Sequence, residues 1–165
     1  MPPSSSQILT VAWPAKSHVT SIGKVPVDVG ALGDRAYLWA SPLQSDLGFN
    51  GDEYLAEGGL NYRWTKRVSW VRFPGVAANG PLELTLRVRG PRPAHQIMPT
   101  VTVRVNGANV GAFQAGSDWA AQRFTLASFP SSTTDLEVSL ECLPFNAGGG
   151  DKRILGVQWD WVRVD

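Results

Sequence analysis

Alternating apolar and polar residues run through most of the chain from residue 60 onward. A period of two predicts a strand with one buried side and one solvent-facing side. The clearest example is 82–89, where the inward residues are Leu82, Leu84, Leu86 and Val88, and the outward ones are Glu83, Thr85, Arg87 and Arg89. Similar patterns predict further strands at 36–40, 60–65, 67–73, 100–105, 110–113, 118–126, 136–142 and 155–164.

The connections between these runs are rich in turn residues. An Asn-Gly pair at 106–107 separates two apolar runs and predicts a tight β-hairpin. The 17 glycines and 12 prolines fit many short strands, and residues 41–59 predict a long surface loop. We therefore predict an all-β fold, an antiparallel β-sandwich or jelly roll of about eight to ten strands. Residues 1–7 are expected to be a flexible lead-in to one domain spanning 8–165.

The closing segment has an irregular phase. Val157 and Trp159 lie on one side of the predicted strand, whereas Val162 and Val164 fall on the other. Either both sides are covered, or a β-bulge shifts the phase. Simple alternation also places Trp161 on the side of Trp159, so that both are core or both are surface.

The composition argues against several classes of function. A net charge of +1 gives no general attraction to nucleic acid or anionic membranes. No apolar run reaches the roughly 18 residues of a membrane span, and the first residues lack the pattern of a signal peptide. If the domain works outside the cell, we expect the larger protein of which it is part to supply the signal for export. Cys142 is the only cysteine, and its strand position predicts a buried small apolar residue.

Catalytic and metal-binding patterns are sparse. The two histidines, His18 and His95, are far apart and lack metal-ligand spacing. Calcium is common in lectin-like sandwiches and needs several converging oxygens, for which Asp28, Asp34 and Asp160 are weak candidates. No dense Asp-x-Asp loop accompanies them. We expect no resident cofactor, with calcium as the alternative.

A small glycoside hydrolase would need only two suitably placed carboxylates. Asp52, Glu53 and Glu57 are close together in the predicted loop. Solvated loop charges are the simpler interpretation of this cluster, so we expect no enzyme.

Seven tryptophans are many for 165 residues, and tryptophan is enriched at recognition surfaces. A flat aromatic side chain can stack on the apolar face of a sugar while polar groups bind its hydroxyls. The stacking candidates are Trp39, Tyr54, Tyr62, Trp119, Trp159 and Trp161. For Trp70 and Trp119, alternation favours a core position.

Two arginine-containing segments complete the candidate chemistry. Arg63 and Trp64 are neighbours on a strand, so they point to opposite sides, while Asp151 and Arg153 share a side. Glu57 precedes Arg63 across a Gly-Gly turn and could pair with it. A guanidinium held by a carboxylate can grip sugar hydroxyls, or the pair can simply fix a loop. The sequence leaves both interpretations open.

Six short segments together resemble a known kind of module. They are VDVG at 27–30, GD at 33–34, GF at 48–49, YRWT at 62–65, VTVRVNG at 101–107 and DKRILGVQWDWVRV at 151–164. The pattern is similar to galactose-binding-like carbohydrate-binding modules and to β-sandwich modules of bacterial polysaccharide-related proteins. Such modules lie beside glycosyltransferases and in extracytoplasmic parts of membrane proteins. Residues 50–56 depart from the pattern.

The resemblance implies a non-catalytic jelly roll with a carbohydrate role, and an extracytoplasmic or secreted location as part of a larger protein. We predict binding of an oligo- or polysaccharide through arginine, carboxylate and aromatic groups. The predicted ligand-binding residues are Glu57, Tyr62, Arg63, Trp64, Asp151, Arg153, Trp159 and Trp161. The alternatives are a structural or assembly module that packs against a neighbouring domain or itself, and, as a weaker alternative, a small glycoside hydrolase.

Overall fold

The computed structural model describes residues 27–28, 48–55, 60–73, 81–126 and 136–165, with the backbone alone at 27–28, 51–55, 61 and 72–73. All the strand pairs in these ranges are antiparallel. The strands are β1 (Val27–Asp28), β2 (Phe49–Leu55), β3 (Leu60–Thr65), β4 (Val68–Phe73), β5 (Leu82–Arg89), β6 (Thr100–Val105), β7 (Ala108–Gln114), β8 (Ala120–Leu126), β9 (Leu136–Cys142), β10 (Phe145–Gly148), β11 (Asp151–Leu155) and β12 (Gln158–Val164).

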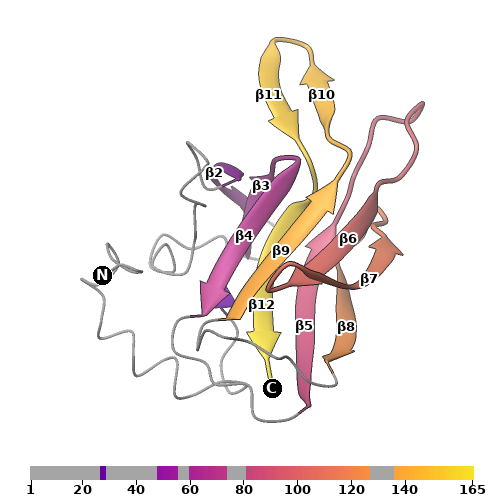
Figure 1. Cartoon of the computed structure of the whole chain (residues 1–165). Coiled ribbons are helices and arrows are strands. Elements are labelled where there is room, and N and C mark those ends of the chain that lie inside the picture. The colour runs from indigo at the N-terminus through magenta and orange to yellow at the C-terminus, as the bar shows by residue number, and fades with distance from the viewer. Residues whose placement is uncertain (1–26, 29–47, 56–59, 74–80, 127–135) are drawn as a thin grey trace.

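Two sheets pack face to face (Figure 1). The larger sheet has the order β2-β3-β12-β5-β8, with β1 also paired to β12, and the smaller sheet has the order β4-β9-β6-β7. Strands β10 and β11 form a separate hairpin that stands beyond one end of the sandwich (Figure 1). The predicted all-β, antiparallel sandwich is therefore confirmed. Within the described ranges, no helix is long and apolar enough to cross a bilayer.

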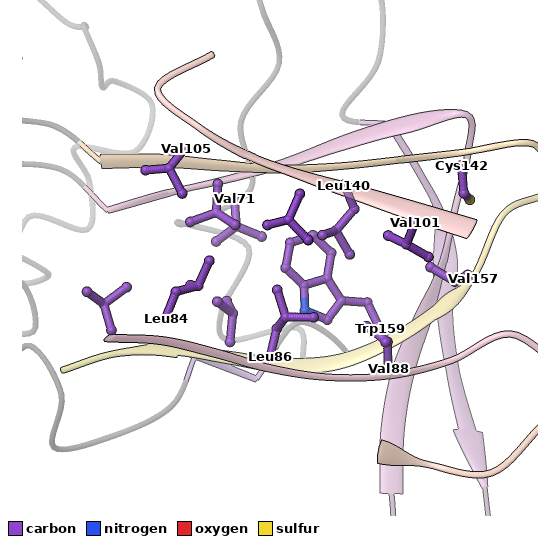
Figure 2. Close-up of a cluster of buried hydrophobic side chains, with 14 of the residues drawn as sticks. Val71, Leu84, Leu86, Val88, Val101, Val105, Leu140, Cys142, Val157 and Trp159 are labelled. Carbon is purple, nitrogen blue, oxygen red and sulfur yellow. The ribbon is translucent and has the colours of Figure 1, made fainter. Parts of the chain in front are cut away.

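The main core fills the space between the sheets (Figure 2). Leu84, Leu86 and Val88 point inward from β5, as the alternation predicts, and Val101 and Val103 point inward from β6. Full burial of each such side chain contributes on the order of 1.5–3 kcal/mol. The largest fully buried side chains also include Trp159, Leu136 and Leu140.

The predicted hairpin at 106–107 is confirmed. Val105 pairs with Ala108, so two residues make the turn. Asn106 has φ 49° and Gly107 has φ 83°, and positive φ at both positions is what a type I′ turn requires. The side-chain oxygen of Asn106 also accepts a hydrogen bond from the backbone N–H of Glu137 at 2.7 Å.

A bulge accounts for the irregular phase of the closing strand. Trp159 pairs with Val88, yet Trp161 pairs with the adjacent Arg87, so β12 carries one extra residue at this point. Trp159 and Val162 can therefore both be buried, while Trp161 lies on the side of Arg87. The bulge interpretation is confirmed, and the prediction that Trp159 and Trp161 share a side is wrong.

Three other predictions need correction. Strand β2 lies within the segment predicted as a loop, and it pairs with β3. The predicted closing strand is two strands, β11 and β12, and β10 was not predicted. The described ranges contain twelve strands rather than eight to ten. The predicted strand at 36–40 and the lead-in lie outside the described residues.

Candidate functional site

The two sequence segments at 62–65 and 151–156 lie next to each other in space through Thr65. The backbone N–H of Thr65 donates to the carbonyl of Val157 at 2.8 Å, and its carbonyl accepts from Gly156 at 2.7 Å. Its hydroxyl accepts from the N–H of Val157 at 2.8 Å. A Cβ at Gly156 would clash with the hydroxyl oxygen of Thr65 and lie 2.5 Å from the carbonyl oxygen of Lys66. The junction therefore requires glycine, and it is built by Thr65 and Gly156 rather than by the arginines.

The arginine and tryptophan of β3 point to opposite sides of the larger sheet. Arg63 pairs with Trp159 on the inner side and is 2% exposed, while Trp64 pairs with Gln158 on the outer side. Tyr62 and Trp64 are also buried, and Trp159 is 0% exposed. In this structure these four predicted ligand residues, Tyr62, Arg63, Trp64 and Trp159, offer almost no surface to a ligand. Tyr62, Trp64 and Trp159 belong to the buried apolar clusters, and Glu57 lies outside the described residues.

A second apolar cluster covers part of the outer side of the larger sheet. We call it the outer aromatic cluster: Leu60, Tyr62, Trp64, Trp119, Phe145 and Leu155. The rings of Trp64 and Phe145 meet edge-on with centroids 5.8 Å apart, and those of Tyr62 and Trp119 with centroids 5.9 Å apart. Phe145 and Leu155 pair across the β10–β11 hairpin. The cluster therefore anchors the hairpin to the sheet.

Trp119 links this cluster to a set of polar side chains. It lies half-exposed just before β8, and the guanidinium carbons of Arg87 and Arg89 are 5.4 and 4.7 Å from its ring centroid. Such cation–π contacts contribute roughly 0.5–1 kcal/mol at exposed sites. Because Gln158 pairs with Arg89 and both lie on the outer side, the indole must lie against that side of the sheet.

Each of the two guanidinium groups is also held by a side chain of β12. Arg87 donates to a carboxylate oxygen of Asp160 at 2.6 Å, and Nε of Arg89 donates to the amide oxygen of Gln158. The side chain of Asp160 is 7% exposed, and the side chain of Arg87 is 34% exposed. These hydrogen bonds position the guanidinium groups before any ligand arrives.

We call this region the outer-face platform: Arg87, Arg89, Trp119, Gln158, Asp160 and Trp161. Trp161 is half-exposed and pairs with Arg87, which places it on the same side. The platform combines a partly open indole with fixed donors and a fixed acceptor. A ligand with an apolar face and peripheral hydroxyls matches this combination, because each of its groups would meet a partner.

Arg92 holds the base of the β10–β11 hairpin through hydrogen bonds to the backbone. Its guanidinium donates to the carbonyl of Gly156 at 2.8 Å and to that of Leu143 at 3.2 Å. The guanidinium carbon also lies 4.3 Å from the ring centroid of Phe145. Desolvation by burial lowers the pKa of Arg92 from its ordinary value. The contacts of Arg92 make it a structural residue next to the platform.

Asp151 and Arg153 form the ion pair that their spacing predicted. The Asp151 carboxylate accepts from Nε and Nη2 of Arg153 at 3.0 and 2.7 Å, and from the Arg153 backbone N–H at 3.0 Å. The side-chain hydrogen bonds from Arg153 lower the pKa of Asp151 to about 2. Both side chains are partly exposed on the projecting hairpin. A ligand role for this pair stays a prediction.

Of the three calcium candidates, only Asp160 has a side chain that the structure describes. Asp34 lies outside the described residues, and the backbone of Asp28 pairs with Trp161 in the sheet. The guanidinium of Arg87 already binds the carboxylate of Asp160, so this residue does not fit a calcium site. Among the described side chains, no three or more His, Cys, Asp or Glu gather as metal ligands. Cys142 is buried, and burial raises the pKa of its thiol, which confirms its apolar interpretation.

Sequence reasoning found only part of the platform. Alternation placed Arg87 and Arg89 on the solvent side, and Trp119 was a stacking candidate with a core position favoured. The structure leaves Trp70 partly buried, and it packs the partly buried Trp119 against the outer aromatic cluster, so neither side chain is fully enclosed in the core. Gln158 was missed, although its place in β12 next to Trp159 was the available signal.

No family model matches the sequence, and no curated protein matches it. Similar solved structures include the C-terminal CBM6 of LamC, a marine laminarinase from Zobellia galactanivorans (12% identity, TM-score 0.48, 85% of this chain and 97% of that chain). Another is the CBM36-1 domain of a multidomain xylanase from the hindgut metagenome of Trinervitermes trinervoides (16% identity, TM-score 0.43, 73% of this chain and 90% of that chain). A third is a CBM36 solved with calcium and xylotriose (14% identity, TM-score 0.40, 73% of this chain and 94% of that chain). At these identities the similarity concerns the fold alone.

Proposed function

We propose that this chain is a non-catalytic glycan-binding module whose ligand site is the outer-face platform. One observation carries the proposal: the half-exposed indole of Trp119 contacts two guanidinium groups that β12 holds in place. An aromatic residue beside fixed polar groups suits a sugar, which has both apolar C–H faces and hydroxyl edges.

Different residues of the outer-face platform would make different kinds of contact with the glycan. Trp119 and Trp161 supply flat apolar surface for sugar rings, and Arg87 and Arg89 donate hydrogen bonds. Asp160 and Gln158 orient the two arginines through the hydrogen bonds already described. Because these groups are fixed in the free protein, little side-chain entropy is lost on binding. Asp151 and Arg153, on the adjacent hairpin, are proposed as outlying contacts.

Isothermal titration against a panel of soluble polysaccharides tests the proposal. We expect Trp119→Ala to weaken the binding of the preferred glycan at least about tenfold, as for a hot-spot aromatic residue. Trp70→Ala is the matched control, because Trp70 is also half-exposed but lies in β4 of the smaller sheet. If the folded protein binds no glycan of the panel, or if both substitutions weaken binding equally, the proposed site is wrong.

The proposed ligand also suggests where the module works and that it belongs to a larger protein. Polysaccharides lie mostly outside the cytoplasm, so we propose that the module works there as part of a larger protein. Fusion of the chain to a fluorescent protein, added to intact cells or cell-wall preparations, would measure surface binding. Binding that Trp119→Ala does not reduce would contradict this assignment.

Assembly with a partner domain or a second copy is the other candidate function. It is favoured by Ile97 and Leu143, which are 86% and 72% exposed, and by the exposed Ile154 of the hairpin. Light scattering across a concentration series distinguishes the two functions. A dimer that Leu143→Ser and Ile154→Ser disrupt would favour assembly, and a monomer at all concentrations would exclude self-association.

A further inference from the structure

The charges around Trp119 are not balanced among the described side chains. Arg87, Arg89 and Arg92 lie at the aromatic end of the outer side, and only Asp160 is paired with any of them. The exposed Asp118, next to Trp119 in sequence, forms no ion pair with these arginines within the described residues.

The other end of the same sheet is different. There the two described arginines of the outer side have acidic partners, with Arg163 bound to Asp165 at 2.7 Å and Arg123 lying 3.6 Å from Glu83. The unmatched positive charge is therefore concentrated beside the indole rather than spread over the sheet.

Arg89 is the clearest source of this unmatched charge. Its Nε donates to Gln158, which is uncharged, and its guanidinium lies over the ring of Trp119. Among the described residues its two terminal nitrogens have no further hydrogen-bond partner and no carboxylate within 4.0 Å. These nitrogens form the planar fork that binds carboxylates and sulfates in two parallel hydrogen bonds.

We propose that the preferred ligand is an anionic glycan, and that the terminal fork of Arg89 binds its carboxylate or sulfate group beside Trp119. This inference rests on the proposed function, because it names the glycan class for the same site. A neutral sugar would need only a hydrogen-bond donor at this position. An anionic group would also compensate the charge that Gln158 leaves unmatched, and its two oxygens can accept parallel hydrogen bonds from the guanidinium fork.

Matched pairs of glycans test the inference. Isothermal titration would compare a uronic-acid polymer with its carboxyl-reduced form, and a sulfated galactan with its desulfated form. We expect at least one acidic form to bind about tenfold or more tightly than its neutral counterpart, with affinity falling as ionic strength rises. A preference within the uronic-acid pair would identify a carboxylate as the bound group, and a preference within the galactan pair would identify a sulfate.

Three variants assign the effect to Arg89. Arg89→Gln should remove most of the preference for the acidic form, and Arg89→Lys should restore only part of it, since lysine keeps the charge but lacks the fork. Arg123→Gln is the control, because Arg123 lies on the same side but faces Glu83. Thermal unfolding of each variant checks that the fold is retained.

The outcomes separate this inference from the proposed function. Equal binding of acidic and neutral forms, reduced by Trp119→Ala but not by Arg89→Gln, would overturn the anionic ligand and leave glycan binding in place. Binding of acidic forms that neither variant changes would overturn both. Loss of the acidic preference in Arg89→Gln but not in Arg123→Gln supports the inference.

Discussion

The two sides of the larger sheet use the same strands for different purposes. The inner side is mostly apolar, and Trp159 there has no exposed surface. The outer side carries Trp119, which is half-exposed and contacts the guanidinium groups of Arg87 and Arg89. Both sides bury aromatic rings, but among the described residues it is the outer side that places guanidinium groups against a partly exposed ring.

The difference teaches that position along a strand decides the role of a residue more than residue type does. In β5, Leu86 and Val88 belong to the core, while the residues between and after them, Arg87 and Arg89, belong to the platform. In β12 the bulge separates Trp159 from Trp161 in the same way. Substitutions on the inner side should therefore lower stability, and those on the outer side should mainly lower binding.

Trp159→Ala should have the largest effect on stability. Removal of a fully buried indole leaves a cavity between the sheets and costs roughly 3–5 kcal/mol in the free energy of unfolding. Urea denaturation followed by circular dichroism measures it. Trp159→Phe keeps a ring and should cost less, so it remains testable if the alanine variant does not fold. A loss below about 1 kcal/mol for Trp159→Ala would show that the inner side is not the main source of stability.

Gly156→Ala should destabilise the junction between β3 and the closing strands. The added methyl group would clash with the hydroxyl of Thr65 and crowd the carbonyl of Lys66, and overpacking of this kind costs roughly 1–3 kcal/mol. Gly116→Ala is the matched control, since a Cβ there meets no heavy atom within 4 Å. Thermal unfolding of both variants gives the comparison. Equal melting temperatures for the two variants would show that the junction accommodates the added methyl group without loss of stability.

Trp119→Ala should destabilise the fold less than Trp159→Ala or Gly156→Ala does. It should weaken glycan binding more than either of them. Its contacts with Tyr62 and two guanidinium groups are partly solvent-exposed, so we expect a loss of about 1–2 kcal/mol. The same variant should lose glycan binding in titration. If its unfolding free energy falls as far as that of Trp159→Ala, the outer aromatic cluster is a second core, and the contrast between the two sides fails.

Local periodicity predicted the sandwich well because its strands each have one buried side. The alternation in β5 and β6 and the Asn-Gly turn at 106–107 were visible without any knowledge of the partners. Strand β2 was missed because its sequence lacks alternation and its pairing with β3 depends on backbone hydrogen bonds. The bulge in β12 left two alternatives open, which only the register against β5 could decide.

The site was harder to predict because it is assembled across strands. Arg63 and Trp64 looked like a ligand pair, yet both are buried by neighbours far away in sequence. The contact of Trp119 with Arg89 joins the start of β8 to the end of β5, and no local pattern encodes it. Only the Asp151–Arg153 pair, two residues apart, could be inferred from spacing alone.

Lowering the pH should produce the smallest effect, confined to the hairpin. The pKa of Asp151 is about 2 in the folded protein, below its ordinary value of 3.8, so the ion pair with Arg153 contributes fully above about pH 4 and is lost as the pH falls through about 2. Carboxyl-carbon NMR titration should give a midpoint near 2 for Asp151, and Arg153→Gln should move this midpoint towards 3.8. Because the pair is solvent-exposed, the signals of Trp159 and Trp119 should not shift together with it. A wild-type midpoint near 3.8 would show that the pair does not persist in solution, and a coincident shift of Trp119 would mean that the hairpin and the platform respond as one unit.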